Sequence, residues 1–214
     1  MSAFYFKNVP DYRMRGFIAV RDAFDNLRNI LQIAEIVNTC PTCLSSHHEA
    51  DFDFVIFSGS FSRALISKSD GYFSMSIPFQ IIDHGEHISF NFDKAGTEVD
   101  GQFISIMRNA ILTSRDECFS YDDIVHSIHE SFGLEIPDAT HYYDAYIALL
   151  MEDHGYLRFD DDPDREDGNI HPRYHFDFFY KNSSSVKIGI KSAADIDCFH
   201  SLFDSSRPKR YLTE

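Results

Sequence analysis

The sequence predicts an α+β protein: an N-terminal helix with a four-stranded antiparallel meander, then a helical half with a β-hairpin and a C-terminal helix. Apolar residues first recur with helical spacing, then alternate as in strands, and return to helical spacing near residue 102. The second half has the element order of a winged helix, three helices followed by a hairpin. We therefore expect one domain over 1–98, a winged-helix-like half over 99–205 and a mobile tail over 206–214, with one continuous domain as the alternative.

The first half changes from helical to strand periodicity. Between residues 22 and 37 apolar side chains recur every three or four positions, which is the pattern of an amphipathic helix. Four segments that follow alternate apolar and polar residues or lie between turn residues, as antiparallel strands with one solvated face do. Pro78 lacks a backbone N–H, so its strand is expected at a sheet edge or with a bulge. The expected strands are 51–57, 63–67, 72–82 and 87–93.

The second half is predominantly helical. Ser120 and Asp123 are spaced as a capping box, and Gly133 suits the C-terminal cap of the same helix. An acidic turn then connects two strands of a hairpin, and Ser192 with Asp195 is expected to cap the last helix. The expected elements are helices 102–112, 120–132 and 137–154, the hairpin 156–180, a short strand 186–190, and a final helix beyond 195.

The composition indicates a folded, acidic protein. Hydrophobic residues make up 43% and aromatic residues 15% of the chain, and 34 acids outnumber 19 bases, which gives a formal charge of −15. This charge repels nucleic acid and anionic membranes and attracts basic partners. No stretch approaches the roughly 18 apolar residues of a membrane span, and the N-terminus lacks the apolar core of a signal peptide. Because four cysteines do not make a disulfide scaffold, we expect a cytoplasmic protein without membrane contact.

The charge distribution argues against direct DNA binding. In a winged helix the helix 138–153 would enter the major groove, yet it contains no Lys or Arg. The segment 152–167 holds eight acids against two arginines, and DNA binding depends on cations that neutralise phosphates. The segment is either a solvated loop or a docking surface for a basic protein. The candidate partner-binding residues are Asp160, Asp161, Asp162, Asp164, Glu166 and Asp167.

The segment CPTCLSSHH (40–48) contains soft metal ligands. A C-x2-C turn presents two thiolates at a separation that suits zinc, with His47 or His48 as the third ligand. A fourth ligand has to come from elsewhere in the chain, and a redox pair or a structural loop are the alternatives. We take Cys40, Cys43 and His47 as candidate ligands of a structural zinc. The candidates for the fourth ligand are Cys118, Cys198 and His200.

The segment HPRYHFDFFY (171–180) contains a second group of candidate residues. On a strand, His171, His175 and Asp177 point to one side, and two imidazoles with a carboxylate suit metal binding or proton transfer. Asp51 and Asp53 are expected as neighbours of this site. The alternative is a strand whose polar face meets water while its aromatic face packs.

Three functional hypotheses follow. The first is a non-enzymatic, acidic interaction subunit of a cytoplasmic assembly, bacterial or phage in origin, that docks a basic or nucleic-acid-handling protein. The second is a metal-dependent hydrolase or nuclease that uses His171, His175 and Asp177. The third is a mimic of nucleic-acid charge that inhibits a DNA-binding enzyme. The sequence contains no nucleophile elbow, phosphate-binding glycine loop or H-E-x-x-H motif.

Overall fold

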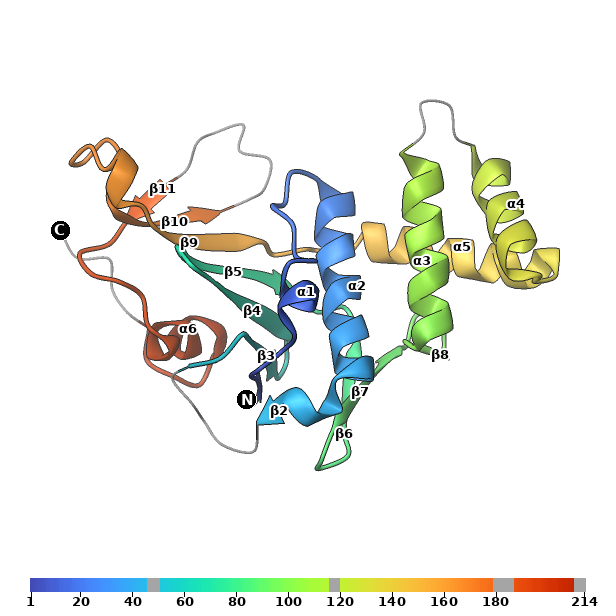
Figure 1. Cartoon of the computed structure of the whole chain (residues 1–214), viewed down its shortest axis with the longest axis horizontal. Coiled ribbons are helices and arrows are strands. Elements are labelled where there is room, and N and C mark those ends of the chain that lie inside the picture. Colours follow the sequence, from blue (N-terminus) through green and yellow to red (C-terminus); the bar gives the residue numbers. More distant parts are fainter. Residues whose placement is uncertain (46–50, 116–119, 179–186, 210–214) are drawn as a thin grey trace. The chain divides into compact units, whose positions relative to one another are not determined.

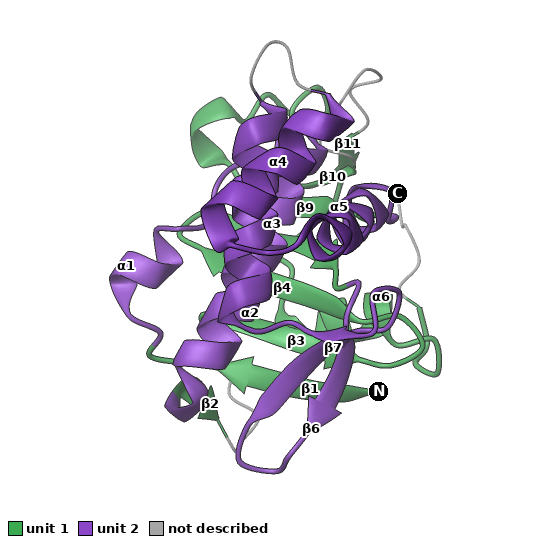
Figure 2. Ribbon diagram, turned by 90° about the vertical axis from the view of Figure 1, so that its right-hand side faces the viewer, with its two compact units in different colours: residues 1–8, 43–77, 154–214 green, residues 9–42, 78–153 purple. Residues whose placement is uncertain are grey.

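The computed structural model describes residues 1–45, 51–115, 120–178 and 187–209. The chain contacts divide it into two compact units, coloured separately in Figure 2. Both units are assembled from segments that are distant in the sequence. The domain boundary expected at residue 98 differs from this division and stays a prediction. Most of the expected tail, 210–214, lies outside the described residues. Unit 1 comprises Met1–Asn8, Cys43–Ile77 and His154–Glu214, and unit 2 comprises Val9–Thr42 and Pro78–Asp153.

Unit 1 is built around an antiparallel sheet. Among the described residues its strands are β1 (Ser2–Phe6), β2 (Leu44–Ser45), β3 (Phe54–Ser58), β4 (Arg63–Lys68), β5 (Gly71–Ser76), β9 (Leu157–Asp161), β10 (Tyr174–Phe178) and β11 (Lys187–Gly189). The strand order is β11-β10-β9-β5-β4-β3-β1-β2 (Figure 1). The β4–β5 hairpin and the β9–β10 hairpin, which are distant in the sequence, therefore belong to one sheet. The two hairpins join where β5 pairs with β9, with Tyr72 opposite Phe159.

One face of this sheet packs against helix α6 (Ile196–Phe203). Asp195 caps the helix, since its carboxylate accepts a hydrogen bond from the backbone N–H of Cys198. The fully buried ring of Phe199 lies against the rings of Phe159 and Phe176, with centroids 6.5 and 6.2 Å away. Side chains alternate between the faces of a strand, so the neighbours of these two phenylalanines point to the opposite face. That face carries the candidate functional site.

Unit 2 contains a small sheet and the remaining α-helices. The three strands of the sheet lie in the order β6-β7-β8. Phe90 and Phe92 of β7 are buried, and Phe103 of α3 lies 6.2 Å from Phe92 between ring centroids. This contact joins the sheet to the helices within the unit. The elements are α1 (Asp11–Met14), α2 (Ala23–Thr39), β6 (Gln80–Asp83), β7 (Ile88–Phe92), β8 (Thr97–Glu98), α3 (Gly101–Ser114), α4 (Tyr121–Phe132) and α5 (Ile136–Leu150).

Local sequence signals placed the ends of α4 correctly and missed other helix ends. The expected helix 137–154 is α5, which ends at Leu150. The expected cap at Ser192 is wrong, because Asp195 itself is the N-cap of α6. Asp22 caps α2 by accepting a hydrogen bond from the N–H of Asp25, close to the expected start. In α4, Ser120 and Asp123 form the expected reciprocal capping box, and Gly133 ends the helix with φ of 65°. The capping box and the C-cap of α4 depended on residues within one short segment, and both predictions are confirmed.

The mixed α+β class is confirmed, but the four-stranded meander is wrong. The expected strand 72–82 is two strands, because β5 ends at Ser76 and β6 begins at Gln80. Pro78 lies between them and cannot donate to a ladder, so the strand ends there. β6 then pairs with β7 in the separate sheet of unit 2, and β3, β4 and β5 remain as a three-strand meander within the larger sheet.

The winged-helix arrangement is not confirmed. The expected wing, strands β9 and β10, pairs with β5 in unit 1, whereas helices α3, α4 and α5 belong to unit 2. The physical reason is that Phe159 and Phe176 are buried in the core under α6, where they are only 2% and 7% exposed. A solvated wing would leave both rings exposed.

Candidate functional site

Five ionisable side chains lie next to one another on strands β9, β10 and β11. The strand register places His175 opposite Asp160, and Asp177 opposite both Arg158 and Lys187. Residues that are directly opposite in an antiparallel sheet share a face, so all five point away from the α6 core. His175, Asp160 and Asp177 are 1%, 6% and 8% exposed. The result is a buried charged cluster, a name we keep for these five residues.

His175 is held in one tautomer. Its Nδ1 lies 2.7 Å from the carbonyl oxygen of Pro172, and its Nε2 lies 2.7 Å from the ammonium of Lys187. A carbonyl only accepts and an ammonium only donates, so Nδ1 carries the proton and Nε2 is the acceptor. The lone pair of Nε2 therefore points to the ammonium of Lys187.

The two carboxylates have opposite electrostatic environments. Burial opposes ionisation of Asp177, but hydrogen bonds from Lys187 and Arg158 outweigh it and hold the pKa of Asp177 below its usual value. These bonds measure 3.0 Å from Lys187 Nζ and 2.6 Å from Arg158 Nη2. For Asp160 burial prevails and raises the pKa, although the Nε of Arg158 lies 2.7 Å away. Such a divergence of neighbouring pKa values is typical of acid–base sites and also occurs in ion-pair networks.

Glycines flank the row formed by Asp160 and His175. Gly71 lies opposite Asp160 and Gly189 opposite His175, so the directly paired residues add no side chain at either end of this row. Gly71 has φ of 144°, and a Cβ there would lie 2.0 Å from the carbonyl oxygen of Phe159. The close approach of β5 and β9 therefore requires glycine at this position.

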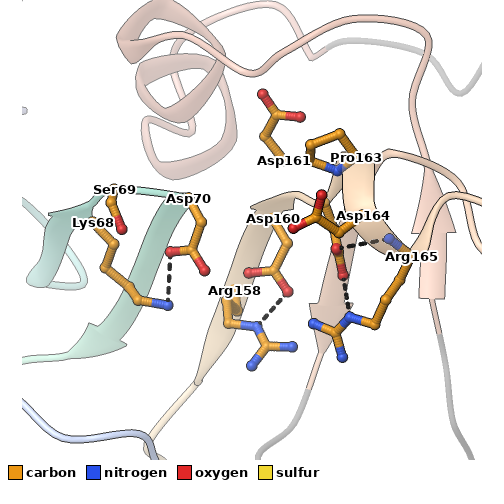
Figure 3. A pocket seen from close by; sticks show the side chains of 10 residues that line it. Lys68, Ser69, Asp70, Arg158, Asp160, Asp161, Pro163, Asp164 and Arg165 are labelled. Carbon is orange, nitrogen blue, oxygen red and sulfur yellow. Dashed lines mark hydrogen bonds and ion pairs between the residues drawn. The ribbon is translucent and has the colours of Figure 1, made fainter.

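A hollow of about 500 Å³ adjoins the buried charged cluster (Figure 3). Arg158 and Asp160 belong to both, so the cluster opens into this hollow. Most charges around it are paired: Lys68 lies 3.2 Å from Asp70, and Arg165 lies 2.9 Å from Asp162. The hollow is lined by Lys68, Ser69, Asp70, Arg158, Asp160, Asp161, Asp162, Pro163, Asp164 and Arg165.

The six acids expected to bind a partner fall into two groups. Asp160 is buried in the cluster, Asp161 pairs with Arg173 at 2.7 Å, and Asp162 pairs with Arg165. The local cations therefore neutralise the first three, which the count of charges in the sequence did not reveal. The other three are exposed and form no ion pair with any residue that the structure describes; they are Asp164, Glu166 and Asp167.

The loop between β9 and β10 has a defined conformation. Pro163–Arg165 form a 3-10 turn, capped by Asp162, whose carboxylate accepts from the N–H of Arg165. The backbone N–H of Asp167 donates to the carbonyl of His171 at 2.9 Å and closes a tight turn. Ile170 lies in this turn and is 83% exposed.

The structure brings together part of the predicted catalytic set. Asp160, His175 and Asp177 have ligand atoms within 4.8 Å of one another, the one such group among the described residues. His171 packs edge-on against the His175 ring, 4.9 Å between centroids, but its Nε2 faces Asp162 at 3.3 Å. Asp160 thus takes the place expected for His171. The alternation of residues 157–161 could have placed Asp160 on one strand face with Arg158, but its position opposite His175 depends on the strand register.

The two acids expected near this site lie elsewhere in the sheet. Asp53 precedes β3, and β3 is four strands away from β10 in the sheet order. With about 4.8 Å between neighbouring strands, the separation is about 19 Å. Asp51 lies 3.4 Å from Lys7. Both expectations were therefore wrong.

The zinc prediction at the cysteines stays a prediction. Cys40 is the C-cap of α2, and Cys43 ends a 3-10 turn, with its thiol 3.5 Å from a backbone carbonyl. His47 lies outside the described residues, as do His48 and Cys118. Cys198 is buried in the α6 core, and His200 contacts the hydroxyl of Tyr5 at 2.8 Å.

Comparisons with protein-family models, with curated proteins and with solved structures found no match for this chain. In the part of the chain that the structure describes, no helix combines the length and the apolar character needed to cross a bilayer.

Proposed function

We propose that this chain is a non-enzymatic interaction subunit of a cytoplasmic assembly and binds a protein with a basic surface through the β9–β10 loop. The observation that carries the proposal is the exposure of Asp164, Glu166 and Asp167 around Ile170. Carboxylates without a partner in the described chain are available to lysines and arginines of another protein. An exposed isoleucine among them adds apolar surface that is buried on binding.

The conformation of the loop supports this proposal. Asp162 caps the 3-10 turn and also lies 3.3 Å from the Nε2 of His171, and the backbone pair of Asp167 and His171 closes the tip. A loop that is already ordered loses less conformational entropy when it binds. The three carboxylates and Ile170 are therefore presented as a fixed set.

A protein is favoured over nucleic acid as the partner. The α5 helix contains no Lys or Arg, and the whole chain has a formal charge of −15. Binding to a nucleic acid takes most of its sequence-independent affinity from cations that replace phosphate counterions. Salt-sensitive retention of a bare DNA duplex by the full chain would contradict this part of the proposal.

The test compares two triple variants with equal charge. Reversal of Asp164, Glu166 and Asp167 to lysine adds six charges and changes the formal charge from −15 to −9. The control reverses three exposed acids of unit 2 and has the same formal charge; they are Glu86, Glu130 and Asp144. A tagged full-length chain captures its partner from an extract of the native host, and the purified partner is then titrated by calorimetry.

We expect the loop variant to bind the purified partner at least about tenfold more weakly, and the control variant to bind as the wild type does. The affinity of the wild type should also fall with added salt, because exposed charges are screened. Unchanged affinity of the loop variant, or an equal loss in both variants, would show that the loop is not the docking surface.

A second candidate function is a metal-dependent hydrolase or nuclease. The convergence of Asp160, His175 and Asp177 beside a hollow favours it, because an open metal site activates water. The assay is hydrolysis of a generic phosphodiester by the purified chain with added Mg²⁺, Mn²⁺ or Zn²⁺. Activity that survives in Asp177→Asn would exclude this site as its source.

A further inference from the structure

We propose that Asp160, His175 and Asp177 bind a zinc ion, and that the ammonium of Lys187 occupies the position of the metal when zinc is absent. This inference is independent of the docking function. It names the metal that the second candidate function requires, and it is tested by binding and not by hydrolysis.

The donor atoms already have nearly the spacing of a zinc site. Ligands about 2.1 Å from a tetrahedral zinc lie about 3.4 Å from one another. The Nε2 of His175 lies 3.6 Å from the Oδ2 of Asp160 and 4.0 Å from the Oδ2 of Asp177. Small side-chain rotations would close these distances, and imidazole nitrogens and carboxylate oxygens are both ligands of zinc.

The orientation of His175 is that of a metal ligand. Its Nδ1–H donates to the carbonyl of Pro172, which leaves Nε2 as the acceptor. Nε2 accepts from Lys187 at 2.7 Å, and carboxylate oxygens of Asp160 and Asp177 lie 3.6 and 4.0 Å away. Histidines that bind metals are usually held in this way by a hydrogen bond from the other ring nitrogen. An ion pair between Asp177 and Lys187 does not by itself require a buried histidine beside it.

Lys187 already places a cation among the donors. Its Nζ lies 2.7 Å from His175 Nε2 and 3.0 Å from Asp177 Oδ1. The lysine side chain is 28% exposed and belongs to β11, the outermost strand, which has three residues. A long side chain on a short edge strand can turn into solvent, and its contacts with Asp177 and His175 set the cost of doing so. A doubly charged ion can therefore replace the ammonium while Arg158 stays paired with the carboxylates.

The surroundings leave the fourth coordination position open. Gly71 and Gly189 add no side chain at either end of the row that Asp160 and His175 form. Asp160 also lines the hollow, from which a water molecule can reach the ion. Three protein ligands and one open position are typical of catalytic zinc, whereas four protein ligands are typical of structural zinc.

The test is a zinc titration of the full chain by calorimetry, in a Cys40→Ser, Cys43→Ser background that removes the other candidate site. We expect this protein to bind one zinc ion. Asp160→Asn should weaken binding at least about tenfold, and Asp177→Asn should do the same. Asp70→Asn changes a carboxylate of the same hollow outside the cluster and should leave the affinity unchanged.

The variant Lys187→Met distinguishes a metal site from a cluster that serves only as a network of ion pairs. If the ammonium competes with zinc, its removal raises the affinity for zinc about tenfold or more. In the wild type, Lys187 occupies the donors in most molecules, whereas in Lys187→Met the donors are always free to bind the ion. Circular dichroism checks that each variant is folded. If Asp177→Asn unfolds, the zinc affinity of Asp160→Asn decides the test. Absence of zinc binding in Lys187→Met, or equal affinity in Asp160→Asn and its parent, would overturn the proposal.

Discussion

Replacement of Asp177 by asparagine should destabilise the protein far more than the same replacement of Asp160. Asp177 receives hydrogen bonds from two cations, Arg158 at 2.6 Å and Lys187 at 3.0 Å. A hydrogen bond to a charged group contributes about 1.5–3 kcal/mol. The side chains of Arg158 and Lys187 are 32% and 28% exposed, so both regain part of their hydration. We therefore expect Asp177→Asn to lose about 2–3 kcal/mol, less than the about 3–5 kcal/mol for a fully buried pair.

Asp160→Asn removes a charge that the fold tolerates poorly. Burial raises the pKa of Asp160, which means that the ionised carboxylate is more costly in the folded chain than in water. A neutral amide of nearly the same shape relieves this cost, and Arg158 keeps its contact with Asp177. We expect a change below about 1 kcal/mol in the free energy of unfolding.

Urea denaturation of both variants at pH 7, followed by circular dichroism, measures this difference. Acidification gives a second reading. The pKa of Asp177 is depressed below 3.8, so its contribution is fully present above that pH and is lost as the pH falls through the folded value. Asp177→Asn should therefore lose less stability below about pH 4 than the wild type does. An equal or larger cost for Asp160→Asn, or an unchanged acid response in Asp177→Asn, would refute the assignment of the two carboxylates.

Three further substitutions test the fold. Gly133→Ala should cost about 1 kcal/mol, because φ is 65° but a Cβ would meet no atom within 4 Å. Gly71→Ala should cost clearly more in the same urea titration, since its Cβ would lie 2.0 Å from a backbone oxygen of β9; equal costs would contradict the β5–β9 pairing. Phe199→Ala should cost about 3–5 kcal/mol, as expected for a buried ring, and a loss below about 1 kcal/mol would mean that α6 does not pack on the sheet.

The sequence predicted the features that depend on near neighbours. The capping box of α4 and the left-handed Gly133 follow from residues close to the two ends of that helix. The shared face of His175 and Asp177 follows from the alternation of a strand. In each case the physical cause lies inside one short segment of the chain.

The features that were missed depend on pairing between distant segments. The expectation that 72–82 would form one strand ignored that β6 has another partner in unit 2. The place of Asp160 in the cluster depends on the register of β9 and β10, which are joined by a long loop. The role of Lys187 depends on the pairing of β11 with β10. Register is set by which side chains become buried together, and a periodic pattern does not specify the partner strand.

The charge of this protein acts through its location more than through its total. The sequence has a run of acids at 160–167, but in the folded chain some of these acids pair with arginines and the others are exposed. Asp160 is enclosed with Arg158, and Asp162 holds both the 3-10 turn and His171, whose ring packs against His175. The buried charged cluster therefore anchors the base of the loop whose exposed carboxylates face outward. The proposed zinc ligands and the proposed docking residues lie on one continuous hairpin. The carboxylates at its base are neutralised by Arg158 and Lys187, whereas those of the loop stay available to a partner.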